Sequence, residues 1–342
     1  MSRALAALAG LLALVPIADC ADRERRDDAA GVVGVLAPPA DGMATGVSSS
    51  EARFVRNVIG FNGPESVRYD AEQDVFFVSN MMGYGSFKDG NGYIVRFSAA
   101  HPDSAVIFVQ GGRNGATLDA PKGMTIHGDT LWVADIDKLR GFDRRTGAPL
   151  ATLDFAPQGA VLLNDVDVGA DGTLRVTDTG ILMNKAGVVH TGPDRIFAVG
   201  PGATISVVSA GTQLRQPNGI HWDSAGGRWI VVSFDPFAGE VAAMPATGAG
   251  RTVLRTGTGR LDGVELLPDG AILFASWADS SVHLLAGGDE RQLVRQVPAP
   301  ADIGLDTRRN RLAIPLSTLG RVQLWSLGAI GRGARADSAA RR

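Results

Sequence analysis

The chain has 342 residues, of which 45% are hydrophobic, and this is enough to bury a sizeable globular core. Its 33 lysines and arginines stand against 36 aspartates and glutamates, and the net charge of −3 with no long basic stripe argues against a nucleic-acid partner. Because Cys20 is the only cysteine, an internal disulfide is excluded.

Residues 1–20, MSRALAALAGLLALVPIADC, place one arginine before an apolar run that ends in small residues and Cys20. This pattern predicts a secretory signal peptide and export to the periplasm or the extracellular space. The position of Cys20 also fits a lipidated N-terminal cysteine, which would make the protein a membrane-anchored lipoprotein. A cytoplasmic protein with an apolar start is the third interpretation.

Two segments have the composition of disordered chain. Residues 21–50 are charged and then rich in Ala, Gly, Pro and Ser, and residues 331–342 read GRGARADSAARR. Such segments bury little apolar surface, so we expect a disordered tether and a disordered tail. The folded domain is then expected over 51–330.

Six related stretches follow one another within 51–330. Each opens with Pro or Leu and a second residue, then continues through an alternating strand, a polar turn such as Asp-Gly or Gly-Gly, and a second apolar strand. In chain order they are PESVRYDAEQDVFFVS from Pro64, PKGMTIHGDTLWVAD from Pro121, LNDVDVGADGTLRVTD from Leu163, PNGIHWDSAGGRWIVVS from Pro217, LDGVELLPDGAILFAS from Leu261 and PADIGLDTRRNRLAIP from Pro300.

A repeat period of about 40–50 residues, with two strands marked and room for two more, is typical of a propeller blade. The sequence therefore predicts an all-β fold, a six-bladed β-propeller with four-stranded blades around a central channel. The last repeat is short and has only three strands of its own. RFVRNVIGF (53–61), which precedes the first repeat, is expected to supply the fourth strand and to close the ring.

The second residue of each repeat begins the innermost strand, so all six are expected at one mouth of the channel. They are Glu65, Lys122, Asn164, Asn218, Asp262 and Ala301. Four carry side-chain oxygens and none is Cys or His. This set suits a hard cation such as Ca²⁺, or another hard divalent ion, better than zinc.

Four of the motifs resemble those of the senescence-marker-protein (regucalcin) and gluconolactonase family, to which paraoxonases and diisopropylfluorophosphatase are related. The motifs are GPESVRYD, LNDVDVGADG, PNGIHWD and DGVELLPDG. The resemblance implies that Glu65, Asn164, Asn218 and Asp262 bind calcium. It also implies that Asp262 is the general base or nucleophile.

The chain departs from this family at two positions. Leu162 stands where sugar lactonases of the regucalcin type have an arginine that grips the substrate, and Lys122 stands where paraoxonases have a catalytic histidine. Sugar-lactone specificity and a histidine mechanism are therefore not implied. The side chains expected to contact a substrate are Lys122, Asn164, Asp135 and Trp277.

The leading hypothesis is an exported, calcium-dependent hydrolase of a small-molecule lactone, ester or phosphotriester. The metal would act as a Lewis acid, and Asp262 would attack directly or activate water. The alternative is a non-catalytic propeller that binds a ligand or partner around a structural metal, since propellers carry many unrelated functions. Synthase or isomerase chemistry on the same scaffold is a further alternative.

Overall fold

The computed structural model describes residues 46, 49, 51–83 and 85–330. The predicted signal peptide, most of the predicted tether, Cys20 and the predicted tail lie outside the described residues. Within them, no helix is long and apolar enough to cross a membrane. The short 3₁₀ turns found there are η1 (Pro102–Ser104), η2 (Ala156–Gln158), η3 (Pro201–Ala203) and η4 (Thr212–Leu214).

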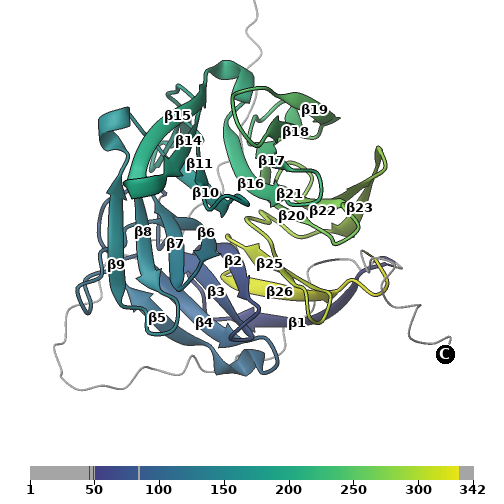
Figure 1. Ribbon diagram of the computed structural model, residues 1–342. Helices are drawn as coiled ribbons and strands as arrows, with labels where there is room; N and C mark the ends of the chain where they lie inside the picture. The colour runs from purple at the N-terminus through teal and green to yellow at the C-terminus, as the bar shows by residue number, and fades with distance from the viewer. Residues whose placement is uncertain (1–45, 47–48, 50, 84, 331–342) are drawn as a thin grey trace, which may run out of the picture. The chain divides into compact units, whose positions relative to one another are not determined.

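The strands form six four-stranded antiparallel sheets arranged as the blades of a β-propeller (Figure 1). Blade 1 consists of β2 (Pro64–Asp70), β3 (Val75–Asn80), β4 (Tyr93–Ser98) and β5 (Val106–Gln110). Blade 2 consists of β6 (Pro121–His127), β7 (Thr130–Asp135), β8 (Lys138–Asp143) and β9 (Pro149–Asp154). Blade 3 consists of β10 (Leu163–Val168), β11 (Leu174–Asp178), β14 (Arg195–Gly200) and β15 (Thr204–Ala210). The predicted fold class is confirmed.

The second half of the ring continues the same pattern. Blade 4 consists of β16 (Pro217–Asp223), β17 (Arg228–Ser233), β18 (Gly239–Pro245) and β19 (Thr252–Gly257). Blade 5 consists of β20 (Leu261–Leu266), β21 (Ile272–Ser276), β22 (Ser281–Ala286) and β23 (Asp289–Arg295). Blade 6 consists of β24 (Gly304–Asp306), β25 (Arg311–Leu316), β26 (Arg321–Ser326) and β1 (Arg53–Ile59).

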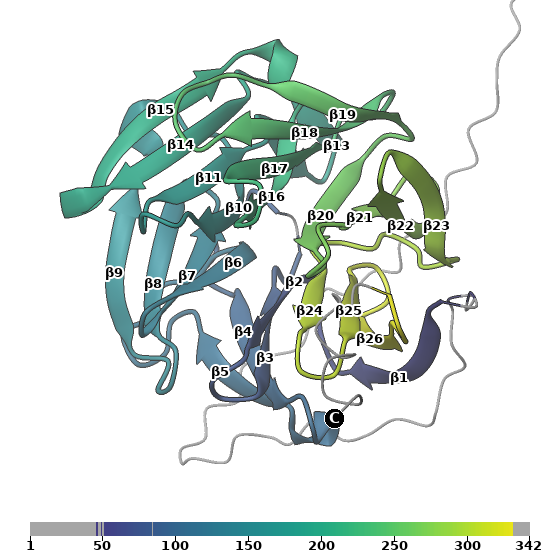
Figure 2. The same ribbon diagram turned by 45° about the vertical axis from the view of Figure 1, so that its right-hand side comes forward.

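Ring closure joins the two ends of the domain. β1 pairs antiparallel with β26, from Arg53 opposite Ser326 to Ile59 opposite Arg321. Figure 2 shows β1 at the outer side of β26, in the blade that the last strands of the domain build. The first strand therefore completes the last blade, as the short sixth repeat predicted.

One element interrupts the repeat. Between the second and third strands of blade 3, the chain forms a separate hairpin of β12 (Ile181–Asn184) and β13 (Gly187–His190). The Met183 N–H donates a 2.9 Å hydrogen bond to Ser86 Oγ, which lies on the β3–β4 loop. The hairpin of blade 3 thus contacts a loop of blade 1.

The apolar core is divided among the blade interfaces. Six clusters of buried hydrophobic residues each join two neighbouring blades, such as Phe77 and Ile94 of blade 1 with Met124 and Leu131 of blade 2. Each sheet is therefore covered on both faces by its neighbours, which explains the continuous apolar runs of the second strands.

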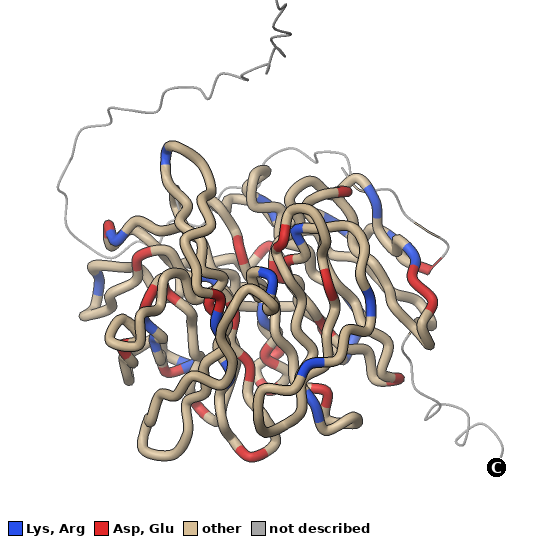
Figure 3. Tube along the Cα trace, turned by 90° about the horizontal axis from the view of Figure 1, so that it is seen from above, with Lys and Arg blue, Asp and Glu red and all other residues tan. Residues whose placement is uncertain are grey.

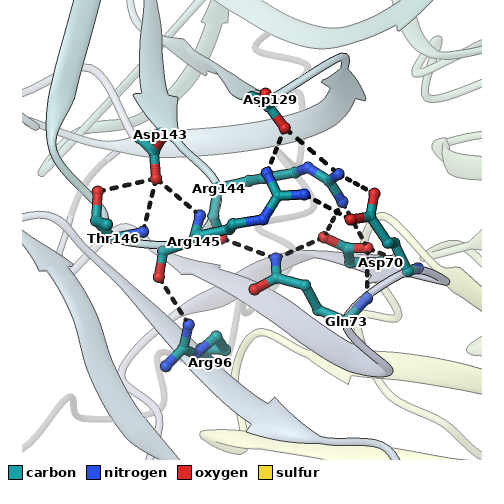
Figure 4. A network of polar contacts seen from close by, with 9 residues as sticks. Asp70, Gln73, Arg96, Asp129, Asp143, Arg144, Arg145 and Thr146 are labelled. Carbon is teal, nitrogen blue, oxygen red and sulfur yellow. Dashed lines mark hydrogen bonds and ion pairs between the residues drawn. The ribbon is translucent and has the colours of Figure 1, made fainter.

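We call the end of the propeller where the innermost strands begin the mouth end, and the other the opposite end. At the opposite end, hydrogen bonds and ion pairs between charged turns connect blade 1 to blade 2 (Figure 4). Arg144 Nη1 donates a 2.8 Å bond to Asp70 Oδ2, and Arg144 also pairs with Glu72. Gln73 Nε2 donates to Asp70 Oδ2 and to the Arg144 carbonyl.

Candidate metal and active site

The regular pairing of five innermost strands is interrupted at the predicted site residues. In β2, β6, β10, β16 and β20, the pairing with the second strand is irregular between the first and fourth residues of the strand. Bulges of this kind redirect side chains. The irregular stretches contain Glu65, Lys122, Asn164, Asn218 and Asp262, in that order of strands.

Glycines let neighbouring innermost strands approach at the mouth. A Cβ on Gly219 would lie 2.4 Å from the Asp262 carbonyl oxygen, and one on Gly263 would lie 2.4 Å from the Ile303 nitrogen. Both distances are too short for any side chain. The Asn-Gly and Asp-Gly pairs that resemble turn signals thus each combine a site residue with a close backbone contact between blades.

Four side-chain oxygens of the predicted ligands are buried without a hydrogen-bond donor among the described residues. They are Glu65 Oε2, Asn164 Oδ1, Asn218 Oδ1 and Asp262 Oδ1. The four residues are only 3–5% exposed. Leaving a buried acceptor unsatisfied is costly, so four of them at the starts of four innermost strands call for a bound group.

The electrostatics of the two carboxyls point to a cation. Burial, followed by the charge of Asp262, raises the pKa of Glu65 well above its ordinary value. Burial, followed by the charge of Asp302, likewise raises the pKa of Asp262. A cation between these groups would offset both the desolvation and the repulsion.

The donor set matches a hard divalent ion. Two carboxylates and two amide oxygens provide hard ligands, and their charge of −2 neutralises a divalent ion such as Ca²⁺. No cluster of three or more His, Cys, Asp or Glu side chains arranged for metal binding occurs in the described part of the chain. This agrees with a site in which half of the ligands are asparagines.

Lys122 occupies the second slot of the ring and is completely buried. Its Nζ donates to the carbonyls of Gly85 at 2.8 Å and Ala120 at 2.9 Å. Burial lowers the pKa of Lys122, and the negative charges of Glu65 and Asp135 oppose that shift. The ammonium has three donors, so one remains after the two carbonyls are satisfied.

Asp135 is placed differently from the expectation. Its carboxylate accepts bonds from the backbone N–H groups of Asp119 and Ala120 and from Arg140 Nε at 3.0 Å. These contacts give it a structural role in blade 2. The substrate contact expected of Asp135 has no support in this geometry.

Trp277 lies near Asp262 on the loop that follows β21. Its indole N–H makes a polar contact with the Asp262 carboxyl, short of a full hydrogen bond, and lowers the pKa of that group. The ring of Trp277 packs edge-on against Phe234 at 5.5 Å between centroids. Trp277 thus contacts both the polar residue Asp262 and an apolar cluster that includes Phe234.

That apolar cluster lines the mouth end. Its members are Met81, Ala120, Ile136, Leu162, Ile181 and Phe234, with Met183 and Trp277 packed against them. We call these residues the mouth cluster. They come from loops and strand starts of blades 1 to 5, and Leu162 is completely buried among them.

Polar residues that sequence reasoning missed fill the axis below the site. Asp165 and Asp302 directly follow the second positions Asn164 and Ala301 of the repeats, where other blades have Gly or Ser. Asp165 Oδ2 accepts a bond from the Ile220 N–H at 2.8 Å, and Ser66 Oγ donates to Asp302 Oδ2 at 2.5 Å. The third position of the repeats is charged in only two of the six, and this difference could have indicated the two buried aspartates.

Comparisons with known proteins agree with this geometry. The family model described as SMP-30/Gluconolactonase/LRE-like region matches residues 63–304. A search of curated proteins found no match.

Solved structures share the fold at low identity. A gluconolactonase from Xanthomonas campestris has 14% identity and a TM-score of 0.61, over 84% of this chain and 98% of the other. A luciferin-regenerating enzyme has 10% identity and a TM-score of 0.57, over 78% and 92%. With most of the propeller matched by the family model, this chain belongs to the SMP-30/gluconolactonase/LRE-like family.

Proposed function

We propose that the protein is a calcium-dependent hydrolase of a lactone, ester or phosphotriester. The observation that carries the proposal is the set of four buried oxygens without donors at the starts of β2, β10, β16 and β20. Membership of a family that includes gluconolactonases supports lactonase-type chemistry.

Glu65, Asn164, Asn218 and Asp262 would hold the ion. When bound, Ca²⁺ would polarise the carbonyl or phosphoryl oxygen of the substrate and stabilise the charge that develops there. The four ligands leave part of a coordination shell of six to eight oxygens free. A bound ion could therefore contact a substrate as well as stabilise the fold.

Asp262 is the group proposed to attack the substrate or to take a proton from water. It is a carboxylate at the mouth of the channel, and burial raises its pKa, which strengthens it as a base. The neighbouring Trp277 N–H favours its ionised form. Asn164 and Asn218 have no basic group, so they would only hold the ion in place.

Lys122 is proposed to favour the negative charge that forms on the substrate. Its ammonium is fixed by two backbone carbonyls and lies close enough to Glu65 to influence its pKa. A fixed positive charge in a site shielded from water stabilises a developing oxyanion. Its remaining N–H provides a donor for that oxygen.

The proposed substrate has an apolar body. Met183 and Trp277, the half-buried members of the mouth cluster, offer apolar surface, and the buried Leu162 supplies no cation where sugar lactonases of the regucalcin type carry an arginine. Apolar walls with few polar groups select ligands mainly by shape and burial. An alkyl lactone or aryl ester fits this lining better than a polyhydroxylated sugar lactone.

The test is hydrolysis by the full-length chain of an alkyl δ-lactone, phenyl acetate, a dialkyl aryl phosphate and glucono-δ-lactone, each with calcium and with a chelator. We expect calcium-dependent turnover, with kcat/KM for the alkyl lactone or aryl ester exceeding that for the sugar lactone about tenfold or more. Calcium binding without turnover of any substrate would favour the non-catalytic propeller.

A further inference from the structure

Exposed apolar side chains gather on the loops of the mouth end. Of the eleven large hydrophobic residues that are exposed in the described part of the chain, four lie on outermost strands: Ile107, Leu150, Val207 and Val253. The other seven lie on loops or the extra hairpin: Met82, Phe87, Leu182, Val188, Val189, Phe237 and Leu319.

The topology puts these seven residues at one end. Each lies between the second and third strands of a blade, and that connection returns to the end where the innermost strand starts. Hydrogen bonds agree with this placement, since the Met81 N–H donates to the Gly63 carbonyl and Ser317 Oγ donates to the Pro64 carbonyl. The seven residues therefore lie at the mouth end, the end that also holds the candidate metal site.

Phe237 is the most exposed of them. It lies on the β17–β18 loop and is 92% exposed, while Val188 and Val189 on the hairpin are 56% and 51% exposed. Single exposed aliphatic residues are ordinary on protein surfaces, but several on neighbouring loops of one end indicate a contact with something apolar.

The mouth end also carries cations without acidic partners among the described residues: Lys185 lies on the hairpin, and three arginines lie on connections between blades or at the end of β23. Arg113, Lys185, Arg260 and Arg295 are exposed, and none forms an ion pair with a residue that the structure describes. Asp89 is an exposed acid at this end that forms no ion pair with any described residue. At the opposite end the exposed charges without an ion pair among the described residues are Asp171, Asp269 and Asp289 against Arg53, which leaves a negative excess.

The charged residues alternate in sign over most of the propeller, without a long stripe of either sign (Figure 3). The difference between the ends therefore lies in which charges are paired. At the mouth end the excess is positive and stands among apolar side chains, and this combination matches an anionic lipid surface.

We infer that the mouth end docks on an anionic lipid bilayer, with Phe237 and the hairpin residues Leu182, Val188 and Val189 entering the interfacial region. Apolar side chains at separate loop tips, with lysine and arginine between them, can enter a fluid interface independently. A rigid protein partner would instead need one continuous complementary patch. This inference does not depend on the proposed catalytic activity.

The experiment uses the full chain with Cys20→Ser, which removes the only cysteine and any lipid attached to it. A single cysteine is then introduced by Phe237→Cys at the mouth end or by Ser224→Cys in the exposed β16–β17 turn at the opposite end. Each variant carries an environment-sensitive dye and is mixed with vesicles of phosphatidylcholine alone or with phosphatidylglycerol. Both variants share residues 1–50, so any vesicle binding by that segment is equal.

We expect the dye at position 237 to shift to the blue with vesicles that contain phosphatidylglycerol, while the dye at position 224 does not shift. Adding Val188→Ser and Val189→Ser to the Phe237→Cys chain should weaken the vesicle affinity about tenfold, since both side chains are exposed and contribute little to the fold. Equal shifts at both positions, or vesicle association without a shift at 237, would overturn the inference.

Discussion

Glu65 and Asp262 begin the innermost strands of blades 1 and 5, and each keeps one buried carboxylate oxygen without a donor. Burial and the charge of Asp262 together raise the pKa of Glu65. Two carboxyls that disfavour each other's ionised form are unfavourable unless a cation or a proton is shared between them. If the proposed metal binds there, the stability of the ring depends on its occupancy.

Replacement of Asp262 by asparagine separates its two proposed roles. The amide keeps one ligand oxygen but has no basicity, so turnover should fall about 10²–10⁴-fold and stay low at saturating calcium. The measurement is kcat as a function of calcium concentration.

Asn218→Ala is the matched control, because it removes a neutral ligand. Calcium should partly restore its activity. If calcium rescued both variants equally, Asp262 would be a ligand only, and the base would have to be sought elsewhere at the mouth.

Calcium should raise the melting temperature of the protein. A ligand that binds only the native state adds about 2.7 kcal/mol at a concentration one hundred times its Kd. Differential scanning fluorimetry with calcium and with chelator checks this, and Glu65→Gln should reduce the shift, whereas Asp269→Asn at the opposite end should not. An unchanged melting temperature at every calcium concentration would count against the metal site.

Lys122→Met should separate calcium affinity from turnover. Removing the ammonium relieves its repulsion of the ion and should tighten calcium binding severalfold, while kcat falls because the positive charge beside the substrate is lost. Calcium titration by calorimetry and steady-state kinetics measure the two effects. Weaker calcium binding together with unfolding would indicate that the lysine is needed only for its two carbonyl contacts.

Gly263→Ala should destabilise the ring. The new Cβ would lie 2.4 Å from the Ile303 nitrogen and 2.5 Å from the Asp302 Cα, which are backbone atoms of the next blade. We expect a loss of about 1–3 kcal/mol in the free energy of unfolding, together with weaker calcium binding, measured by urea denaturation and calcium titration. Gly200→Ala is the control, since its Cβ would meet no atom within 4 Å.

Asp74 should make stability depend on acid pH. Arg309 donates two 2.7 Å hydrogen bonds to its carboxylate, and they lower the pKa of Asp74 from 3.8 to about 2. The lowered pKa means that its stabilising effect is present above about pH 4 and is lost as the pH falls toward 2.

The difference in melting temperature between the wild type and Asp74→Asn should therefore be largest near neutral pH and should shrink as the pH falls. Asp89→Asn, an exposed residue without a cation partner, should show no such trend. A difference that did not change with pH would mean that the two residues contribute by packing.

The repeat motifs predicted the fold well because each is local. Asp-Gly and Gly-Gly turns between alternating and apolar strands define the first two strands of a blade, and the short sixth repeat predicted that 53–61 closes the ring. The second position of each repeat predicted which residues stand at the mouth, because equivalent positions of equivalent strands must fall at the same end.

What the sequence did not predict depends on contacts between blades. The partners of Lys122 include Gly85, which is 37 residues away on another blade. Asp135 occupies a second-strand end at the mouth, yet the loop before β6 turns its backbone N–H groups toward it. The β12–β13 hairpin adds strands that no repeat predicted, since its sequence has no counterpart in the other blades.

The pairing of β1 with β26 has a consequence for how the protein is made. The first strand must wait until almost the entire domain has left the ribosome, because its partner begins at Arg321. Until β26 emerges, β1 has no partner and β25 keeps an open hydrogen-bonding edge. A chain stopped before Arg321, or clipped after Ile59, should therefore recruit strands from other copies and aggregate, while a circular permutant that joins β26 directly to β1 should close the ring early in folding.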